Sequence, residues 1–142
     1  MSNGEPPDTP ETAVLVDNRQ DTPVDVEAVT DLAFRCLRGE GATGELSISF
    51  VTLDEMVDLH ERYMREEGPT DVLSFPQGED GLLGDVVICP AFAAKNNPEL
   101  DTEVRLLVVH GILHLLGHDH EDDDERAVMW AKQEAYTGVR VP

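Results

Sequence analysis

The sequence predicts a single domain in which strands and helices follow one another along the chain, and three observations support this. The chain has 142 residues, and one domain typically takes roughly 100–200 residues. Apolar residues alternate with polar ones in some stretches and recur at spacings of three and four in others, which are the periods of strands and helices. No internal repeat or low-complexity block interrupts the domain. We therefore expect a disordered leader over residues 1–12 and one domain over 13–142.

The strands are predicted from apolar runs, from alternation and from the turns that bound them. Residues 13–18, AVLVDN, form a first apolar strand, and 45–53, ELSISFVTL, alternate as a half-buried strand does. The strand over 70–76 ends in Pro76, which favours a sheet edge because proline cannot donate a ladder hydrogen bond. The continuous apolar run over 83–89 is typical of a strand that is covered on both faces.

The helices are predicted from apolar residues that recur at three and four. Their expected ranges are 23–38, 55–65, 91–96, 102–116 and 122–136. The expected N-caps are Asp54, Thr102 and Asp122, whose side-chain oxygens can accept a hydrogen bond from a free backbone N–H in the first turn. The helix over 102–116 has the most complete apolar side and is the strongest of these predictions.

The composition is strongly acidic. Ten Lys and Arg oppose thirty Asp and Glu, which gives a formal net charge of −20. This balance argues against broad nucleic-acid binding through a basic face, because phosphate neutralisation needs clustered cations.

No apolar run approaches the roughly 18 residues of a membrane span, and the N-terminus lacks a signal-peptide pattern. We expect a cytoplasmic protein without a membrane partner, and free buried thiols at Cys36 and Cys89.

Four of the five histidines fall in the segment HGILHLLGHDH over 110–120. His110 and His114 are four residues apart, so on a helix their rings lie on one face and can bind one metal ion. Gly117 supplies a helix-ending residue, and the turn after it can present His120 as the third ligand. Three neutral imidazoles with an open fourth position are typical of a catalytic zinc site, whereas structural sites fill all four positions.

The spacing H-x-x-x-H-x-x-G-x-x-H also occurs in metzincin proteases, whose motif has a glutamate after the first histidine. Gly111 occupies that position in this chain. A protease of that kind needs the glutamate as the general base for a zinc-bound water. The sequence therefore predicts a metzincin-like zinc helix without ordinary peptidase chemistry.

The same segment resembles the signature of the YbeY family of bacterial rRNA maturation factors, whose usual form is H-G-x-L-H-L-x-G-Y-D-H. A second family block is visible as GPTDVLSFP over 68–76, followed by LLGDVVIC over 82–89. Both blocks stand in the family's order, so the resemblance covers roughly residues 13–136. It implies an α+β fold, in which a small mixed sheet with an edge strand beside the metal helix packs with several helices.

The resemblance also implies a function. Members of this family are zinc-bound, single-strand-specific endoribonucleases that act in small-subunit rRNA 3′ maturation and in ribosome quality control. Carried over residue by residue, the metal ligands are His110, His114 and His120, holding one Zn²⁺ per chain. The implied partners are single-stranded RNA and an rRNA precursor, ribosomal proteins of the small subunit, and an assembly GTPase; DNA is not among them.

Two positions depart from the family pattern. His118 replaces the family's tyrosine, which leaves the ligand spacing intact and adds a titratable ring. Many members have an arginine after the helical tyrosine, whereas Met64 follows Tyr63 in this chain. Arg62 or Arg65 can replace that arginine only if its side chain points into the same groove.

Further catalytic candidates are His118, Asp119 and Asp85, which could transfer protons or orient the metal ligands, in addition to His114 itself. The acidic run over 119–125 is interpreted as a capped helix start, since negative charge favours a helix N-terminus. Two alternative functions stay open at this point. One is a zinc hydrolase of peptides or small molecules, and the other is a non-catalytic ribosome-assembly factor with a structural metal.

Overall fold

The fold is built around one mixed four-stranded sheet. The computed structural model describes residues 12–77, 79 and 81–139, so most of the expected leader lies outside the described residues. The strands are β1 (Ala13–Asn18), β2 (Glu45–Phe50), β3 (Val72–Pro76) and β4 (Leu82–Ile88), in the spatial order β1-β2-β4-β3. β1, β2 and β4 are parallel, and β3 pairs with β4 in the antiparallel direction. The mixed sheet and the edge position of the strand ending at Pro76 are confirmed.

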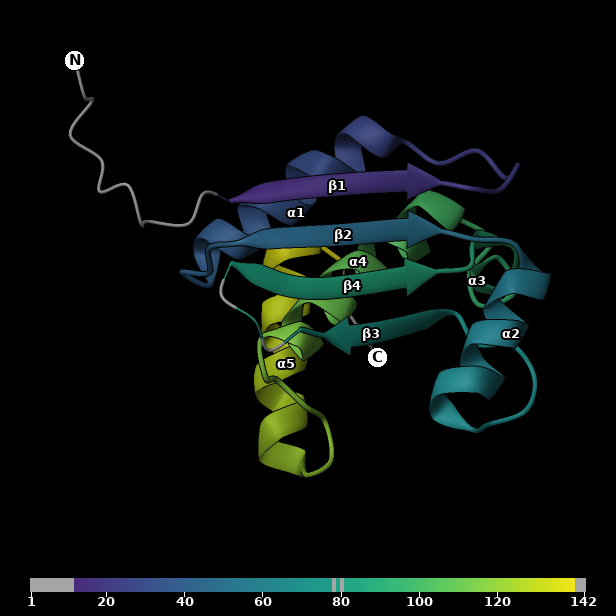
Figure 1. The fold of residues 1–142 in the computed structure, drawn as a ribbon. Helices are drawn as coiled ribbons and strands as arrows, with labels where there is room; N and C mark the ends of the chain where they lie inside the picture. Colours follow the sequence, from purple (N-terminus) through teal and green to yellow (C-terminus); the bar gives the residue numbers. More distant parts are fainter. Residues whose placement is uncertain (1–11, 78, 80, 140–142) are drawn as a thin grey trace, which may run out of the picture.

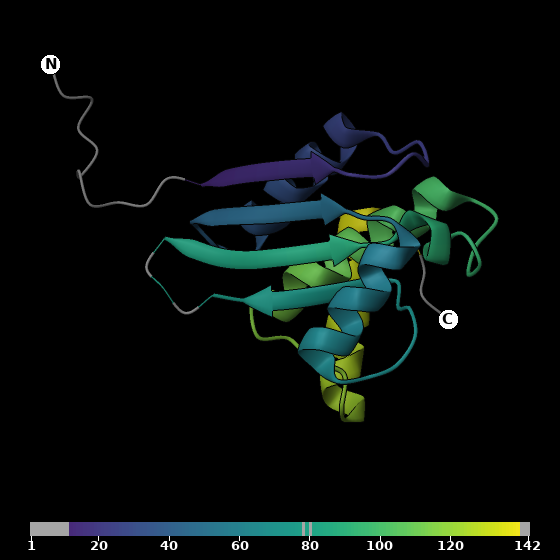
Figure 2. The same cartoon turned by 45° about the vertical axis from the view of Figure 1, so that its right-hand side comes forward.

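Three helices cover one face of this sheet. They are α1 (Val26–Gly39), α4 (Leu100–Leu115) and α5 (Asp123–Thr137), and Figures 1 and 2 show them behind the strands. α4 is the central helix, since it contacts β3, β4, α1 and α5. α2 (Leu53–Met64) and the short α3 (Pro90–Ala93) lie at one end of the sheet. Among the described residues, no helix other than α2 lies over the opposite sheet face. The α+β fold is confirmed.

The main core lies between the sheet and these helices. Leu46, Ile48 and Phe50 of β2 are completely buried, as expected for alternate residues on one face of a strand. They pack with apolar residues of α1 and α4 in one cluster. A second, smaller cluster forms on the other side of the sheet, where α2 covers residues such as Val87 and Cys89. Cys36 and Cys89 are free and buried, as predicted, and burial raises the pKa of the Cys36 thiol to about 12.

Two predicted N-caps were wrong, and the first helix begins at Val26 rather than at residue 23. α2 begins at Leu53, because the hydroxyl of Thr52, and not Asp54, accepts the hydrogen bond from the backbone N–H of Glu55. The strand before it ends at Phe50 and not at Leu53. α4 begins at Leu100 without a side-chain cap on Glu99, so Thr102 lies inside the helix.

The start of α5 agrees with the prediction, since Asp122 accepts from the backbone N–H of Glu125 at 2.7 Å. The predicted helix over 91–96 is shorter, because only Pro90–Ala93 are helical. None of the helices in the described ranges combines the length and the apolar character that crossing a bilayer requires.

Candidate metal centre

The last two turns of α4 and the turn after them position three histidine rings. His110 and His114 lie one above the other on the helix, and α4 ends at Leu115. Gly117 adopts a positive φ of 98°, a conformation that glycine reaches without a Cβ clash. The chain then reverses, and the Asp119 carboxylate accepts a hydrogen bond from the backbone N–H of His120 at 2.8 Å. This local geometry returns His120 to the two helical rings.

The three rings lie close enough to share an ion. The ring centroids of His110 and His114 are 5.2 Å apart, and His120 lies 5.5 Å from the first and 5.6 Å from the second. One nitrogen from each ring can be chosen so that all three lie within 4.8 Å of one another. All three residues are half-buried, and within the described residues they form the one such group of potential ligands. His110, His114 and His120 could therefore hold a metal ion.

The chemistry of these residues fits a divalent transition metal. The Nδ1 atom of His110 lies 2.8 Å from Oε1 of the buried Gln133 on α5. Because the amide oxygen can only accept, His110 donates from Nδ1, which leaves Nε2 free as a ligand. Burial lowers the pKa of His110 although this hydrogen bond opposes the shift. The neutral ring, which is the form that binds metals, is consequently favoured.

A small hollow opens beside two of these histidines. It has a volume of about 240 Å³ and is bounded by the end of α2, the edge strand β3 and the face of α4 that carries His110 and His114. Met64, at the position where many YbeY members have arginine, lines this hollow. Arg62 is instead ion-paired with Asp58 at 3.0 Å. Arg65 is exposed at the left-handed residue that ends α2.

The remaining predicted catalytic residues do not join the three rings. The Nε2 atom of His118 is 3.1 Å from Oε1 of Glu40, at the end of α1. Asp119 braces the turn through its hydrogen bond to the backbone of His120. Asp85 lies on the open face of the sheet, because its neighbour Val86 points the other way and packs into the main core. The structure thus separates Asp85 from the histidines by the thickness of the sheet.

The close packing around Gly111 explains why this helix carries no glutamate after its first histidine. A Cβ atom on Gly111 would lie 2.6 Å from Cγ1 of Val86 and 3.3 Å from Oγ of Ser74. The hydroxyl of Ser74 also donates to the carbonyl oxygen of Gly111 at 3.2 Å. α4 and the sheet are in close contact here, so a glutamate side chain has no space at this position. The arrangement therefore lacks the general base of a metzincin peptidase.

The sequence analysis did not identify two residues that contribute to the site. Gln133 follows Met129 by four residues on the buried side of α5, and a polar residue on an apolar stripe is a signal that could have identified it. Glu40 follows Gly39 after α1, where no local pattern marks it. Its carboxylate accepts hydrogen bonds from Lys132 at 3.0 Å and Tyr136 at 2.5 Å and pairs with His118. Glu40 therefore ties the turn before His120 to α1 and α5.

Replacing Gln133 with methionine is expected to weaken metal binding by about 10- to 100-fold, the usual cost of losing the partner that orients a ligand histidine. Methionine keeps the volume of the side chain but offers His110 no strong acceptor. Zinc affinity measured by competition with a chromogenic chelator checks this. Gln133→Glu is the matched control, because it retains the acceptor and should bind zinc at least as tightly as the parent. Equal affinities for the parent and Gln133→Met would show that the hydrogen bond does not orient His110.

Replacing Glu40 with glutamine is expected to lower the free energy of unfolding near neutral pH by about 1.5 kcal/mol, the value of a buried hydrogen bond to a charged group. Burial alone would raise the pKa of Glu40, but hydrogen bonds from Tyr136, Lys132 and His118 lower it overall. A carboxyl whose folded pKa is lowered stabilises the protein above its unfolded pKa of about 4.3. That contribution is lost as the pH falls through the folded value.

The test is urea unfolding as a function of pH for the parent and Glu40→Gln. The two stabilities should converge as the pH falls below about 4.3. Glu61→Gln, at an exposed position on α2, is the control and should follow the parent. A constant difference between the parent and Glu40→Gln at every pH would contradict the assignment of charge to Glu40.

Comparison with known proteins agrees with this geometry. A family model described as Endoribonuclease YbeY matches residues 15–138. A protein named endoribonuclease YbeY from Streptomyces coelicolor is 42% identical over 143 aligned residues, covering 87% of each chain. Its namesake from Thermobifida fusca is 42% identical and covers 85% of this chain and 89% of its own. The solution structure of TM1509 from Thermotoga maritima matches with a TM-score of 0.68 and 28% identity, over 88% of this chain and 87% of that one. The family match spans most of the domain and includes all three histidines of the candidate metal centre, so this chain belongs to the endoribonuclease YbeY family.

Proposed function

We propose that this protein is a zinc-dependent endoribonuclease that cleaves single-stranded RNA, with His110, His114 and His120 as the ligands of one zinc ion per chain. The family supports an endoribonuclease role with an RNA substrate. The observation that carries the proposal is the group of three histidine nitrogens within 4.8 Å of one another. The hollow beside His110 and His114 offers room for a scissile phosphate next to these rings.

Bound zinc supplies a Lewis acid that can stabilise negative charge on a phosphoryl oxygen or lower the pKa of a water molecule. The protein's own residues prepare the site for this chemistry. Gln133 fixes the tautomer and the orientation of His110, and Trp130 on α5 lies 5.5 Å from the His120 ring between centroids. Glu40 holds the preceding turn through His118. These contacts fix the ligand rings before the metal binds, which reduces the cost of reorganisation during reaction.

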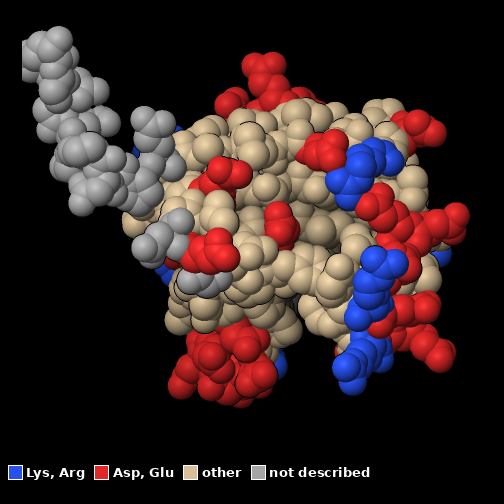
Figure 3. Space-filling model, in the orientation of Figure 1, with Lys and Arg blue, Asp and Glu red and all other residues tan. Residues whose placement is uncertain are grey.

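The charge distribution indicates the direction from which RNA approaches. Figure 3 shows Asp and Glu gathered over the start of α5 without Lys or Arg among them, whereas the side formed by α2 carries Lys and Arg next to Asp and Glu. The acidic residues include Asp122, Asp123 and Asp124, which repel a phosphate backbone. Arg62 and Arg65 are exposed at the end of α2, beside the hollow that Met64 lines. We therefore expect RNA to reach the histidines past Arg62 and Arg65 at the end of α2, and not past the start of α5.

In the cell, we propose that this activity serves small-subunit rRNA 3′ maturation and ribosome quality control in the cytoplasm. The proposed partners are an rRNA precursor, ribosomal proteins of the small subunit and an assembly GTPase, as the family resemblance implies. The absence of a glutamate at Gly111 favours this role over that of a peptide hydrolase. Processing of the rRNA 3′ end in cells that carry an inactive variant at normal abundance tests this part of the proposal.

The direct test of the enzyme is metal analysis of the natively purified protein, paired with cleavage of a labelled single-stranded RNA. We expect about one zinc per chain. Cleavage should stop after chelation and return when zinc is restored, and the same RNA annealed to its complement should resist. A casein digest serves as the negative control. Cleavage that continues at full rate in the chelated, metal-free protein would overturn the proposal.

A further inference from the structure

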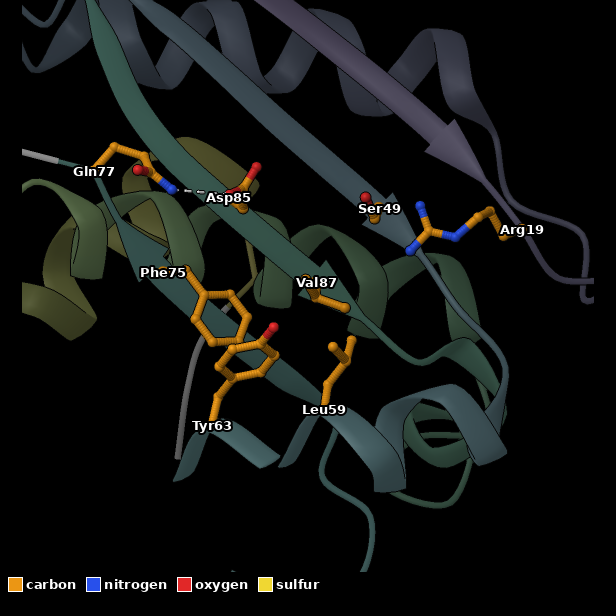
Figure 4. Close-up of a pocket in the computed structure, with 8 residues that line it drawn as sticks. All are labelled: Arg19, Ser49, Leu59, Tyr63, Phe75, Gln77, Asp85 and Val87. Atoms are coloured by element: carbon orange, nitrogen blue, oxygen red, sulfur yellow. Dashed lines mark hydrogen bonds between the residues drawn. The ribbon is translucent and has the colours of Figure 1, made fainter. Parts of the chain in front are cut away.

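A second hollow lies on the open face of the sheet, on the opposite side of β3 from the metal centre. It has a volume of about 370 Å³, which is within the roughly 300–1,000 Å³ of small-molecule sites. Figure 4 shows its walls. Tyr63 of α2 and Phe75 of β3 form one side, and Asp85 of β4 and Gln77 after β3 form another. Phe75 packs against the smaller core cluster, but neither that cluster nor the metal centre accounts for the exposed Tyr63 or for the polar pair of Asp85 and Gln77.

The aromatic side offers a stacking surface. The rings of Tyr63 and Phe75 meet edge to face, with centroids 5.5 Å apart and planes at 71°. Tyr63 is 57% exposed. An exposed ring held in place by a neighbouring ring can stack with a planar base, and such stacking is tolerant of base identity.

The polar side offers an ordered row of hydrogen-bonding atoms. Asp85 and Phe75 are direct cross-strand partners in the antiparallel pair of β3 and β4, so their side chains stand next to each other on one face. The Nε2 atom of Gln77 donates to Oδ2 of Asp85 at 3.4 Å. Nε2 carries a second hydrogen, so the row reads donor, acceptor, acceptor along Gln77 Nε2, Asp85 Oδ2 and Asp85 Oδ1.

Guanine matches this row better than the other three RNA bases. Its Watson–Crick edge presents O6, N1–H and the N2 amino group, which is acceptor, donor, donor. Uracil places an acceptor where the second carboxylate oxygen lies, while adenine and cytosine each place a ring acceptor against the first. A carboxylate has no hydrogen to donate, so each of these mismatches sets two acceptors against each other.

The hollow and the metal centre lie within reach of one RNA strand. Tyr63 and Met64 are consecutive residues of α2, and the first lines the aromatic hollow while the second lines the hollow at the histidines. Likewise, on β3, Phe75 lines the aromatic hollow and Ser74 lines the hollow at the histidines. A single strand that passes the end of α2 can therefore place one nucleotide in each hollow. Arg62 and Arg65, exposed at this end of α2, can contact its phosphates.

We propose that the hollow between α2 and the open sheet face is a subsite for an unstacked guanine base of the single-stranded RNA substrate. Tyr63 and Phe75 provide the stacking surface, and Asp85 with Gln77 reads the Watson–Crick edge, which is the usual way that proteins recognise single-stranded bases. This inference rests on the proposed function and deepens it, because it gives the endoribonuclease a base preference next to its cleavage site.

The test is an NMR titration of the ¹⁵N-labelled full chain with GMP, AMP, CMP, UMP and IMP, which carry the same phosphate. We expect GMP to shift the amides of Phe75, Gln77 and Asp85, with a Kd roughly tenfold lower than that of AMP, CMP or UMP, as for one bidentate pair. IMP lacks the 2-amino group and should bind with intermediate affinity. Equal dissociation constants for GMP, AMP, CMP and UMP, or shifts confined to residues 110–120, would overturn the proposal.

Variants separate the two walls of the hollow. Asp85→Asn replaces an acceptor with a donor and should reduce the preference for GMP below about twofold, since the bidentate pair is lost. Tyr63→Ala should weaken the binding of every nucleotide by about tenfold, because the stacking surface is lost. Tyr63→Phe keeps the ring and should leave the affinities unchanged. Asp31→Asn, at an exposed position on α1, is the matched control and should change nothing. An unchanged GMP preference in Asp85→Asn would refute the assignment of Asp85.

The titration also distinguishes this proposal from the proposed function. GMP should bind His114→Ala as it binds the parent, because the hollow lies on the other side of β3 from the histidines. Zinc-dependent RNA cleavage without any guanine preference in binding would contradict the guanine subsite but support the proposed enzyme function. A guanine preference in a protein that cleaves no RNA would support the subsite but contradict the proposed enzyme function.

Discussion

Replacing His114 with alanine is expected to remove both the bound zinc and RNA cleavage, while the protein stays folded. His114 is half-buried at the last turn of α4 and supplies one of three potential ligands. Two imidazoles alone leave the ion held by half of a tetrahedral shell. A metal contributes several kcal/mol to charge stabilisation, and each 1.4 kcal/mol is a factor of ten in rate. We therefore expect cleavage to fall by at least about 100-fold.

Two further histidine variants make this result specific. His60 on α2 contacts the carbonyl oxygen of Gly68 at 2.9 Å and lies outside the group of three, so His60→Ala should retain zinc and cleavage. His118→Ala should also retain zinc at about one ion per chain, because this ring pairs with Glu40. Loss of zinc from His118→Ala with retention in His114→Ala would mean that the ligand set is wrong.

Much of the fold could be predicted because it depends on local patterns. The alternation of Leu46, Ile48 and Phe50 identified β2, and Pro76 identified the edge strand. The helix starts were less predictable, since Thr52 and Asp54 are both acceptable N-caps and only the end of β2 decides between them. The strand order β1-β2-β4-β3 could not be derived from the residues alone. It depends on contacts between elements that are distant in the chain.

For the candidate site as well, local patterns could be predicted from the sequence and contacts between distant elements could not. Spacing alone brings His110, His114 and His120 together, because one helix and one turn hold all three. Gln133 and Glu40 act on these rings from α5 and from the end of α1, and sequence separation hides such contacts. The prediction for Asp85 missed that strand residues alternate between faces. Its neighbour Val86 enters the core, so Asp85 must face the other way.

Replacing Gly111 with alanine is expected to lower the free energy of unfolding by about 2 kcal/mol, although alanine is the better helix former. The helix propensity alone would stabilise by about 1 kcal/mol. The new methyl group, however, would lie 2.6 Å from Cγ1 of the buried Val86, and overpacking in a well-packed core costs about 3 kcal/mol at the upper end. Urea denaturation measures the difference. Ala131→Gly, at an exposed position in the middle of α5, calibrates the helix propensity.

A double-mutant cycle with Val86→Ala identifies the clash as the cause. Val86→Ala removes both Cγ atoms that the new methyl group would meet. The double variant should therefore be more stable than the sum of the two single effects by at least about 1 kcal/mol, which is a typical coupling between residues in contact. Simple additivity would mean that α4 already has room at Gly111. In that case the close approach of helix and sheet would no longer explain why this metal helix lacks the glutamate of a peptidase.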